Sequence, residues 1–148
     1  MGVMVNKSNI ISHYNSIIFD FDGVILDSNN VKKTAISAAA DGVLSDAERA
    51  EFVDYFVRFN GVPREEKIAK FVPASSTQNV LDRYEEILEK ELACAELIPG
   101  VRQFICELFD SGKEMIVLSG GTESEVAGLL AKNGLDSYFM GVYGGPLR

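Results

Sequence analysis

Residues 16–24 read Ser-Ile-Ile-Phe-Asp-Phe-Asp-Gly-Val, and this stretch decides the fold. The apolar run is typical of a buried parallel strand, and Gly23 lets the chain turn directly after it. Because alternate residues of a strand point to the same face, we expect Asp20 and Asp22 to project to one side, within reach of one cation and one phosphate oxygen. The pattern predicts a metal-assisted phosphoryl-transfer site.

The aspartate pair has two other interpretations. An aspartate pair at the end of a strand is often only the start of a polar turn. A calcium loop of the EF-hand type is disfavoured, because that loop needs further oxygen ligands and a closing Glu, whereas Ile25 and Leu26 follow Gly23 here.

The composition is that of an ordinary globular protein of 148 residues, 47% of them hydrophobic and 24% charged. A formal net charge of −8 argues against general affinity for nucleic acid or anionic membranes, because both need a basic surface. The sequence has neither an apolar run long enough to span a bilayer nor an N-terminal signal peptide. We therefore expect a cytoplasmic protein that binds neither nucleic acid nor membranes and that holds any anionic substrate through a cation or aimed amides.

Sulfur and imidazole groups are few. Cys94 and Cys106 are too few and too unpatterned for a disulfide framework or a zinc site, so we expect both thiols to be buried or half-buried. His13 is the only histidine and precedes the first predicted strand, which argues against a histidine-based triad or zinc site.

Several predicted helices follow the first strand, each with apolar residues at three- and four-residue spacing. Four of them, separated by turns rich in Gly, Pro, Asn and Ser, span Val31–Ala40, Asp46–Phe59, Arg64–Phe71 and Thr77–Ala93. A fifth runs from Pro99 to Asp110.

A second apolar strand, Met115–Ser119, ends in a serine followed by Gly120 and Gly121. The next helix begins with a capping box at Thr122, and a short strand from about Phe139 to Tyr143 comes last. Strands alternating with helices imply a parallel α/β sheet with right-handed crossovers, and the four helices after the first strand imply an inserted lid.

The Ser119 turn is the second candidate site element. Its hydroxyl and the amides of Gly120 and Gly121 would bind an anion beside a helix N-terminus, at the sheet edge where ligands of open parallel sheets bind. A turn of this kind is also often only a tight connection from strand to helix.

In these two motifs the chain resembles the haloacid dehalogenase-like hydrolase superfamily, in which a strand ending Asp-x-Asp-Gly is followed by a strand ending in Ser or Thr. Residues 20–24 and 116–120 match those motifs. The resemblance implies a Rossmann-like core formed by residues 1–27 and 97–148, with the helical residues 28–96 as the small cap of one subgroup. The family's basic and acidic C-terminal motifs are not found in full, so the sheet is expected to be incomplete at its C-terminal side; Arg148 lies near the expected lysine but is not taken as its match.

The resemblance also implies the roles of the site residues. Asp20 would be the nucleophile that forms an aspartyl-phosphate, and Asp22 the general acid and then base. Ser119, with Gly120 and Gly23, would bind the phosphoryl oxygens. Asp20 and the backbone carbonyl of Asp22 would hold Mg²⁺.

In the cap, Arg64 and Lys67 lie where the family's substrate loop is expected, so either would contact a substrate carboxylate or sugar oxygen. An exposed basic helix start is an equally good interpretation of these two residues.

The expected function is therefore a Mg²⁺-dependent phosphatase of a small phosphorylated metabolite, with weak or no activity in a chain that lacks the C-terminal motifs. The second Asp favours a phosphatase over a dehalogenase. A phosphomutase of the same family and a non-catalytic anion-binding or assembly module are the alternatives. The missing fourth strand would leave the first strand on an open edge, so we expect either a fragment of a longer enzyme or a homodimer through that edge.

Overall fold

The computed structural model describes residues 11–145 of the chain, which divide into two compact units. One comprises residues 11–25 and 98–145 and contains the sheet. The other is helical and comprises Leu26–Leu97, inserted after the first strand. Arg148, noted above for the basic motif, lies outside the described residues.

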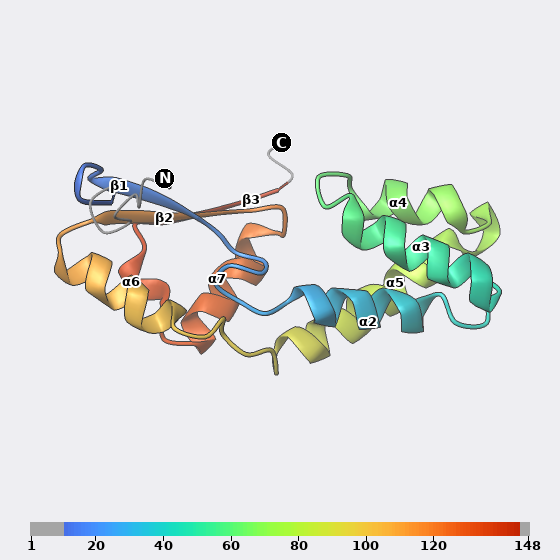
Figure 1. The fold of residues 1–148 in the computed structure, drawn as a ribbon. Coiled ribbons are helices and arrows are strands. Elements are labelled where there is room, and N and C mark those ends of the chain that lie inside the picture. The colour runs from blue at the N-terminus through green and yellow to red at the C-terminus, as the bar shows by residue number, and fades with distance from the viewer. Residues whose placement is uncertain (1–10, 146–148) are drawn as a thin grey trace, which may run out of the picture. The chain divides into compact units, whose positions relative to one another are not determined.

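The sheet of the first unit has three parallel strands in the order β1-β2-β3. They are β1 (Ser16–Asp20), β2 (Glu114–Ser119) and β3 (Gly141–Gly144) (Figure 1). Helices α6 (Val101–Asp110) and α7 (Glu123–Lys132) and the short 3₁₀ helix η1 (Asp136–Tyr138) connect the strands. This arrangement confirms the predicted incomplete Rossmann-like parallel sheet with an inserted helical segment.

Within residues 11–145, only one face of the sheet is buried, and it is the face that α6 and α7 cover (Figure 1). Phe19, Met115 and Val117 are buried, and the Phe19 ring contacts the Phe104 ring of α6. On the opposite face the register aligns Ile18, Leu118 and Tyr143, which are 65%, 51% and 49% exposed. Parallel sheets are normally covered on both faces, so the uncovered face is an unusual feature of the part of the chain that the structure describes.

The four predicted helices of the inserted unit are present. They are α2 (Asn29–Ala39), α3 (Asp46–Arg58), α4 (Arg64–Phe71) and α5 (Ala74–Leu92). Ser45 and Glu48 form a reciprocal capping box at the start of α3. Among the described residues, none of the helices combines the length and the apolar character needed to cross a membrane.

Three predicted helix starts were wrong. Helix α2 begins at Asn29, two residues before the expected Val31, because its exposed first turn is polar and follows Ser28 directly. Helix α5 begins at Ala74, three residues before the expected Thr77, because Pro73 has the fixed φ that precedes a helix and polar residues are tolerated in an exposed first turn. Helix α6 begins at Val101 and not at Pro99, because Gly100 precedes it with φ 82°, a left-handed conformation outside the helix.

An aromatic cluster holds the helical unit together. The fully buried Phe52 lies 5.8 Å from Phe56 and 5.3 Å from Phe71, measured between ring centroids. Tyr84 on α5 adds an edge-to-face contact with Phe56 at 5.3 Å. These rings join α3, α4 and α5 into one core.

Replacing Phe52 by Ala should destabilise this unit by about 3–5 kcal/mol, because the change removes buried apolar surface and leaves a cavity. Chemical denaturation followed by far-UV circular dichroism measures the loss. Val53→Ala, which removes fewer buried carbon atoms from the same helix, should lose clearly less stability. Equal losses for the two variants would contradict a core centred on Phe52.

Candidate functional site

The carboxyl edge of the sheet brings the two predicted motifs together. Asp20 is the last residue of β1 and Ser119 is the last residue of β2. The register pairs Asp20 with Leu118, so Ser119 lies one position beyond it on the neighbouring strand. This edge is where ligands of open parallel sheets bind.

The carboxylate of Asp20 is exposed and oriented. Its Oδ1 accepts a hydrogen bond of 2.7 Å from the backbone N–H of Phe21, which fixes the side chain at the end of the strand. Gly23 then turns the chain with φ 73°, and the N–H of Ile25 donates to the carbonyl of Phe21 at 2.9 Å. The half-buried Asp22 lies inside this turn. The glycine is needed here because the left-handed φ disfavours other residues.

Ser119 is 8% exposed, and its hydroxyl oxygen accepts a 3.0 Å hydrogen bond from the N–H of Gly121. The hydroxyl hydrogen remains able to donate to an anion, because a hydroxyl is both donor and acceptor. The amide of Gly121 is thus directed at Ser119 and not outward, which leaves the Gly120 amide as the remaining predicted donor. Thr122 accepts from the N–H of Glu125 at 3.3 Å and so begins α7.

The donors present suit Mg²⁺ in its usual protein environment of one or two carboxylates, substrate phosphate and water. Asp20 and Asp22 are the carboxyl groups that the first motif brings to this edge, and the carboxylate of Glu125 lies beside Gly121 in the Ser119 turn. Across residues 11–145 no group of three or more His, Cys, Asp or Glu side chains is placed to hold a metal by itself. A Mg²⁺ ion here would therefore depend on substrate oxygens and water for much of its coordination.

The expectation that both thiols are at least half-buried is wrong for Cys94. Cys94 is exposed because it follows the end of α5 in a turn, whereas Cys106 on α6 is half-buried as expected.

Arg64 and Lys67, the predicted specificity residues, lie in different surroundings on α4. Arg64 is half-buried, and its Nη1 lies 3.4 Å from Oε1 of Glu85. Lys67 is only 5% exposed, and its Nζ donates to the backbone carbonyl of Phe56 at 2.9 Å and lies 3.9 Å from the centre of the Phe56 ring. Lys67 thus binds a carbonyl in the last turn of α3, whereas the side chain of Arg64 remains 26% exposed.

The pKa of Lys67 is lowered to about 8, first by burial and then by the positive charges of Lys32 and Arg64. Both effects disfavour the charged ammonium. This shift could not be predicted from the sequence, because Lys32 is on α2 and only the tertiary structure brings it near Arg64 and Lys67 on α4.

Folding stability should rise with pH between about 8 and 10.5, because Lys67 holds fewer protons in the folded state than in the unfolded state across that window. Below about pH 8 Lys67 is charged in both the folded and the unfolded state, so the folded state bears the full cost of the buried charge. We expect the difference in Tm between the wild type and Lys67→Met to grow in favour of the wild type from pH 8 to 10.5. Parallel Tm curves for the two proteins would show that Lys67 titrates normally.

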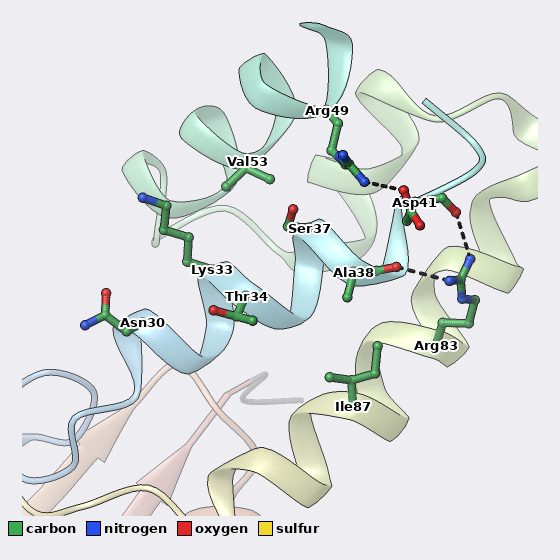
Figure 2. Close-up of a pocket in the computed structure, with 10 residues that line it drawn as sticks. All are labelled: Asn30, Lys33, Thr34, Ser37, Ala38, Asp41, Arg49, Val53, Arg83 and Ile87. Carbon is green, nitrogen blue, oxygen red and sulfur yellow. Dashed lines mark hydrogen bonds and ion pairs between the residues drawn. The ribbon is translucent and has the colours of Figure 1, made fainter. Parts of the chain in front are cut away.

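A groove of about 850 Å³ lies over α2 and is flanked by α3 and α5 (Figure 2). Two of its cations are engaged in packing. Arg83 donates to the carbonyls of Asp41 and Ala38, each at 3.1 Å, and Arg49 pairs with the carboxylate of Asp41. These bonds join α3 and α5 to the C-terminal end of α2, so the groove has a structural explanation and is not assigned as a site.

Comparison with known families gives one clear result. The family model for the haloacid dehalogenase-like hydrolases matches residues 17–146. A search of curated proteins found no match.

Solved structures share the fold at low sequence identity. A haloacid dehalogenase-like hydrolase from Streptococcus pneumoniae is 21% identical over 92% of this chain, with a TM-score of 0.73. A protein from Haemophilus somnus named as a predicted phosphoglycolate phosphatase is 17% identical over 91%, with a TM-score of 0.69. A candidate beta-phosphoglucomutase from Thermotoga maritima is 19% identical over 89%, with a TM-score of 0.67. The matches cover 63%, 64% and 62% of those chains, so the present chain spans less than two thirds of their length.

Proposed function

Because the chain belongs to the haloacid dehalogenase-like hydrolases, we propose that it is a Mg²⁺-dependent phosphatase that hydrolyses a small phosphorylated metabolite through an aspartyl-phosphate. The observation that carries this proposal is the position of Asp20, exposed and oriented at the end of β1, next to the strand that ends in Ser119. The carboxyl ends of β1 and β2 would thus supply a nucleophile and a hydrogen-bond donor to an anion at one edge of the sheet.

In the first step a carboxylate oxygen of Asp20 attacks phosphorus, and the bond from phosphorus to the leaving alkoxide oxygen breaks. Asp22 donates a proton to that oxygen. The hydroxyl of Ser119 and the Gly120 and Gly23 amides donate to phosphoryl oxygens. When bound, Mg²⁺ supplies positive charge to the phosphoryl group, and the Asp20 carboxylate with the backbone carbonyl of Asp22 would hold it.

In the second step water attacks the phosphorus of the aspartyl-phosphate. Asp22, now ionised, accepts a proton from that water, and the bond from phosphorus to the Asp20 oxygen breaks. Inorganic phosphate leaves, and the Asp20 carboxylate is restored. Each carboxyl group therefore ends the cycle in its starting protonation state.

Turnover of p-nitrophenyl phosphate with Mg²⁺ tests this chemistry. Asp20→Asn should lower kcat by about 10³-fold or more, because it removes the nucleophile while keeping the shape of the side chain. Ser119→Ala should lose about 10²-fold, as expected for a single donor to a developing charge. Chelation of Mg²⁺ should abolish turnover.

Asp110→Asn, an exposed carboxylate at the end of α6, is the matched control and should retain wild-type activity. Absence of turnover in a folded wild type would remove the hydrolase proposal for this chain and favour a non-catalytic anion-binding module. Turnover that survives in Asp20→Asn would exclude the aspartyl-phosphate.

A phosphomutase is the second candidate, favoured by the structural likeness to the beta-phosphoglucomutase candidate. Both reactions would use Asp20, and they differ in whether water or a sugar hydroxyl receives the phosphoryl group. A hexose phosphate supplied with a catalytic amount of its bisphosphate separates them. Isomerisation without release of phosphate would favour the mutase.

Arg64 is the better of the two predicted specificity residues, since its side chain is partly exposed while the Lys67 ammonium is occupied by the Phe56 carbonyl. We assign Arg64 to a carboxylate or sugar oxygen of the substrate, and Lys67 to holding the end of α3 in place. The absence of nucleic-acid and membrane binding and the cytoplasmic location stay predictions.

We further propose that β1 pairs with a second copy of the chain. Within residues 11–145, β1 is an edge strand of the sheet, and its exposed Ile18 lies on the same face of the sheet as the exposed Leu118 and Tyr143. Unpaired strand edges with apolar side chains favour pairing with another chain. Antiparallel pairing of two β1 strands would extend both sheets and shield Ile18.

Light scattering over a range of protein concentrations should show a dimer for the wild type. Ile18→Glu should shift the protein to monomer, because the new carboxylates would face apolar surface and one another. Met140→Glu makes the same charge change at a residue that is 71% exposed and outside β1, and should leave the dimer intact. A wild type that is monomeric at every concentration would refute the pairing.

A further inference from the structure

Gly144 approaches a neighbouring backbone segment more closely than a side chain allows. It is the last residue of β3 and the register partner of Ser119. A Cβ atom placed on it would lie 2.3 Å from the amide nitrogen of Glu123, 2.5 Å from the carbonyl oxygen of Gly121 and 2.7 Å from the carbonyl carbon of Thr122. Real Cβ atoms essentially never come within 3.0 Å of such atoms, so any other residue here requires the backbone to move.

The other glycines near this edge do not share this constraint. A Cβ on Gly141, three residues earlier on β3, would meet only the flexible side chain of Tyr143, at 3.0 Å or more. On Gly145 the nearest atom is the carbonyl oxygen of Gly120, at 3.4 Å, and on Gly120 there is nothing within 4 Å. Among these four glycines, the close approach to a neighbouring backbone is therefore specific to Gly144.

The segment that Gly144 approaches is the turn that carries Ser119. Within the turn, the N–H of Gly121 donates to the hydroxyl oxygen of Ser119 at 3.0 Å. The carbonyl of Gly121 accepts a hydrogen bond of 2.9 Å from the N–H of Gly145. Gly121 is thus bonded to Ser119 through its N–H and to the end of β3 through its carbonyl.

From this geometry we propose that Gly144 is a positioning residue for phosphate binding: its missing side chain lets the end of β3 hold the Ser119 turn in the conformation that binds the phosphoryl group. The inference rests on the proposed role of Ser119. With any side chain at position 144, the carbonyl of Gly121 and the amide of Glu123 must move away from β3. That movement carries the Gly121 amide, and with it the Ser119 hydroxyl, out of place.

Titration with inorganic phosphate in the presence of Mg²⁺, followed by ¹⁵N–¹H NMR spectra, tests the proposal. In the wild type the amides of Gly120 and Gly121 should shift on addition of phosphate, and the titration yields a Kd. In Gly144→Ala the Kd should rise about 10- to 100-fold, the scale of effect expected when a binding group is displaced by about 1 Å. The signals of the α6 residues should remain where they are in the wild type.

Gly145→Ala is the matched control, because it adds the same methyl group one residue later, where no atom is closer than 3.4 Å. It should bind phosphate like the wild type. If Gly144 had a merely structural role, Gly144→Ala would lower the Tm without changing the Kd of the folded protein for phosphate. Unchanged phosphate binding in a folded Gly144→Ala would therefore overturn the proposal.

A second variant covers the case in which Gly144→Ala does not fold. Gly145→Pro replaces the N–H that bonds the Gly121 carbonyl by a ring carbon, which breaks this bond and displaces the carbonyl without adding an atom at position 144. It should also weaken phosphate binding, and wild-type affinity in this variant would count against a turn held by β3. Failure of the wild type itself to bind phosphate would refute the proposed function, and is thereby distinguishable from failure of the role of Gly144.

Discussion

The parallel pairing of β1 with β2 is the constraint on which the rest of the site depends. Backbone hydrogen bonds fix Asp20 opposite Leu118, so the two strands end within one residue of each other. A shift of the register by one residue would turn Phe19 out of the core and the exposed Ile18 into it. The burial of alternate apolar residues on one face therefore fixes the positions of Asp20, the proposed nucleophile, and Ser119, the proposed phosphate donor.

The sequence predicted much of this because its signals are local. The apolar run before Asp20 and the apolar run before Ser119 each define a strand, and parallel strands of one sheet place their carboxyl ends on one edge. The four helices of the inserted unit could likewise be predicted from the three- and four-residue spacing of their apolar residues. Helix starts were less predictable, because the difference between a polar turn and an exposed first turn, as at Ser75 and Ser76, depends on contacts that local spacing does not encode.

Two features, one in each unit of the structure, could not be predicted because they depend on tertiary contacts. Lys67 reads as an exposed lysine in a basic stretch, and its burial follows from the position of the Phe56 carbonyl on another helix. Gly144 reads as one of several glycines in a turn, and its importance follows from the distance between β3 and the start of α7. In both cases the deciding neighbour is more than ten residues away in the chain.

The net charge of the protein explains why phosphate binding would depend on a few groups at the sheet edge. With a net charge of −8, the chain as a whole repels a phosphate dianion, and Asp20 and Asp22 do so at the closest range. At physiological ionic strength charges beyond about 8 Å are largely screened, so distant acidic residues contribute little and the groups at the sheet edge decide binding. The Ser119 hydroxyl and a few amides are neutral donors and cannot offset two carboxylates alone. The proposed Mg²⁺ ion would do so, because it would reverse the sign of the local charge while binding the same carboxylates that would otherwise repel the substrate.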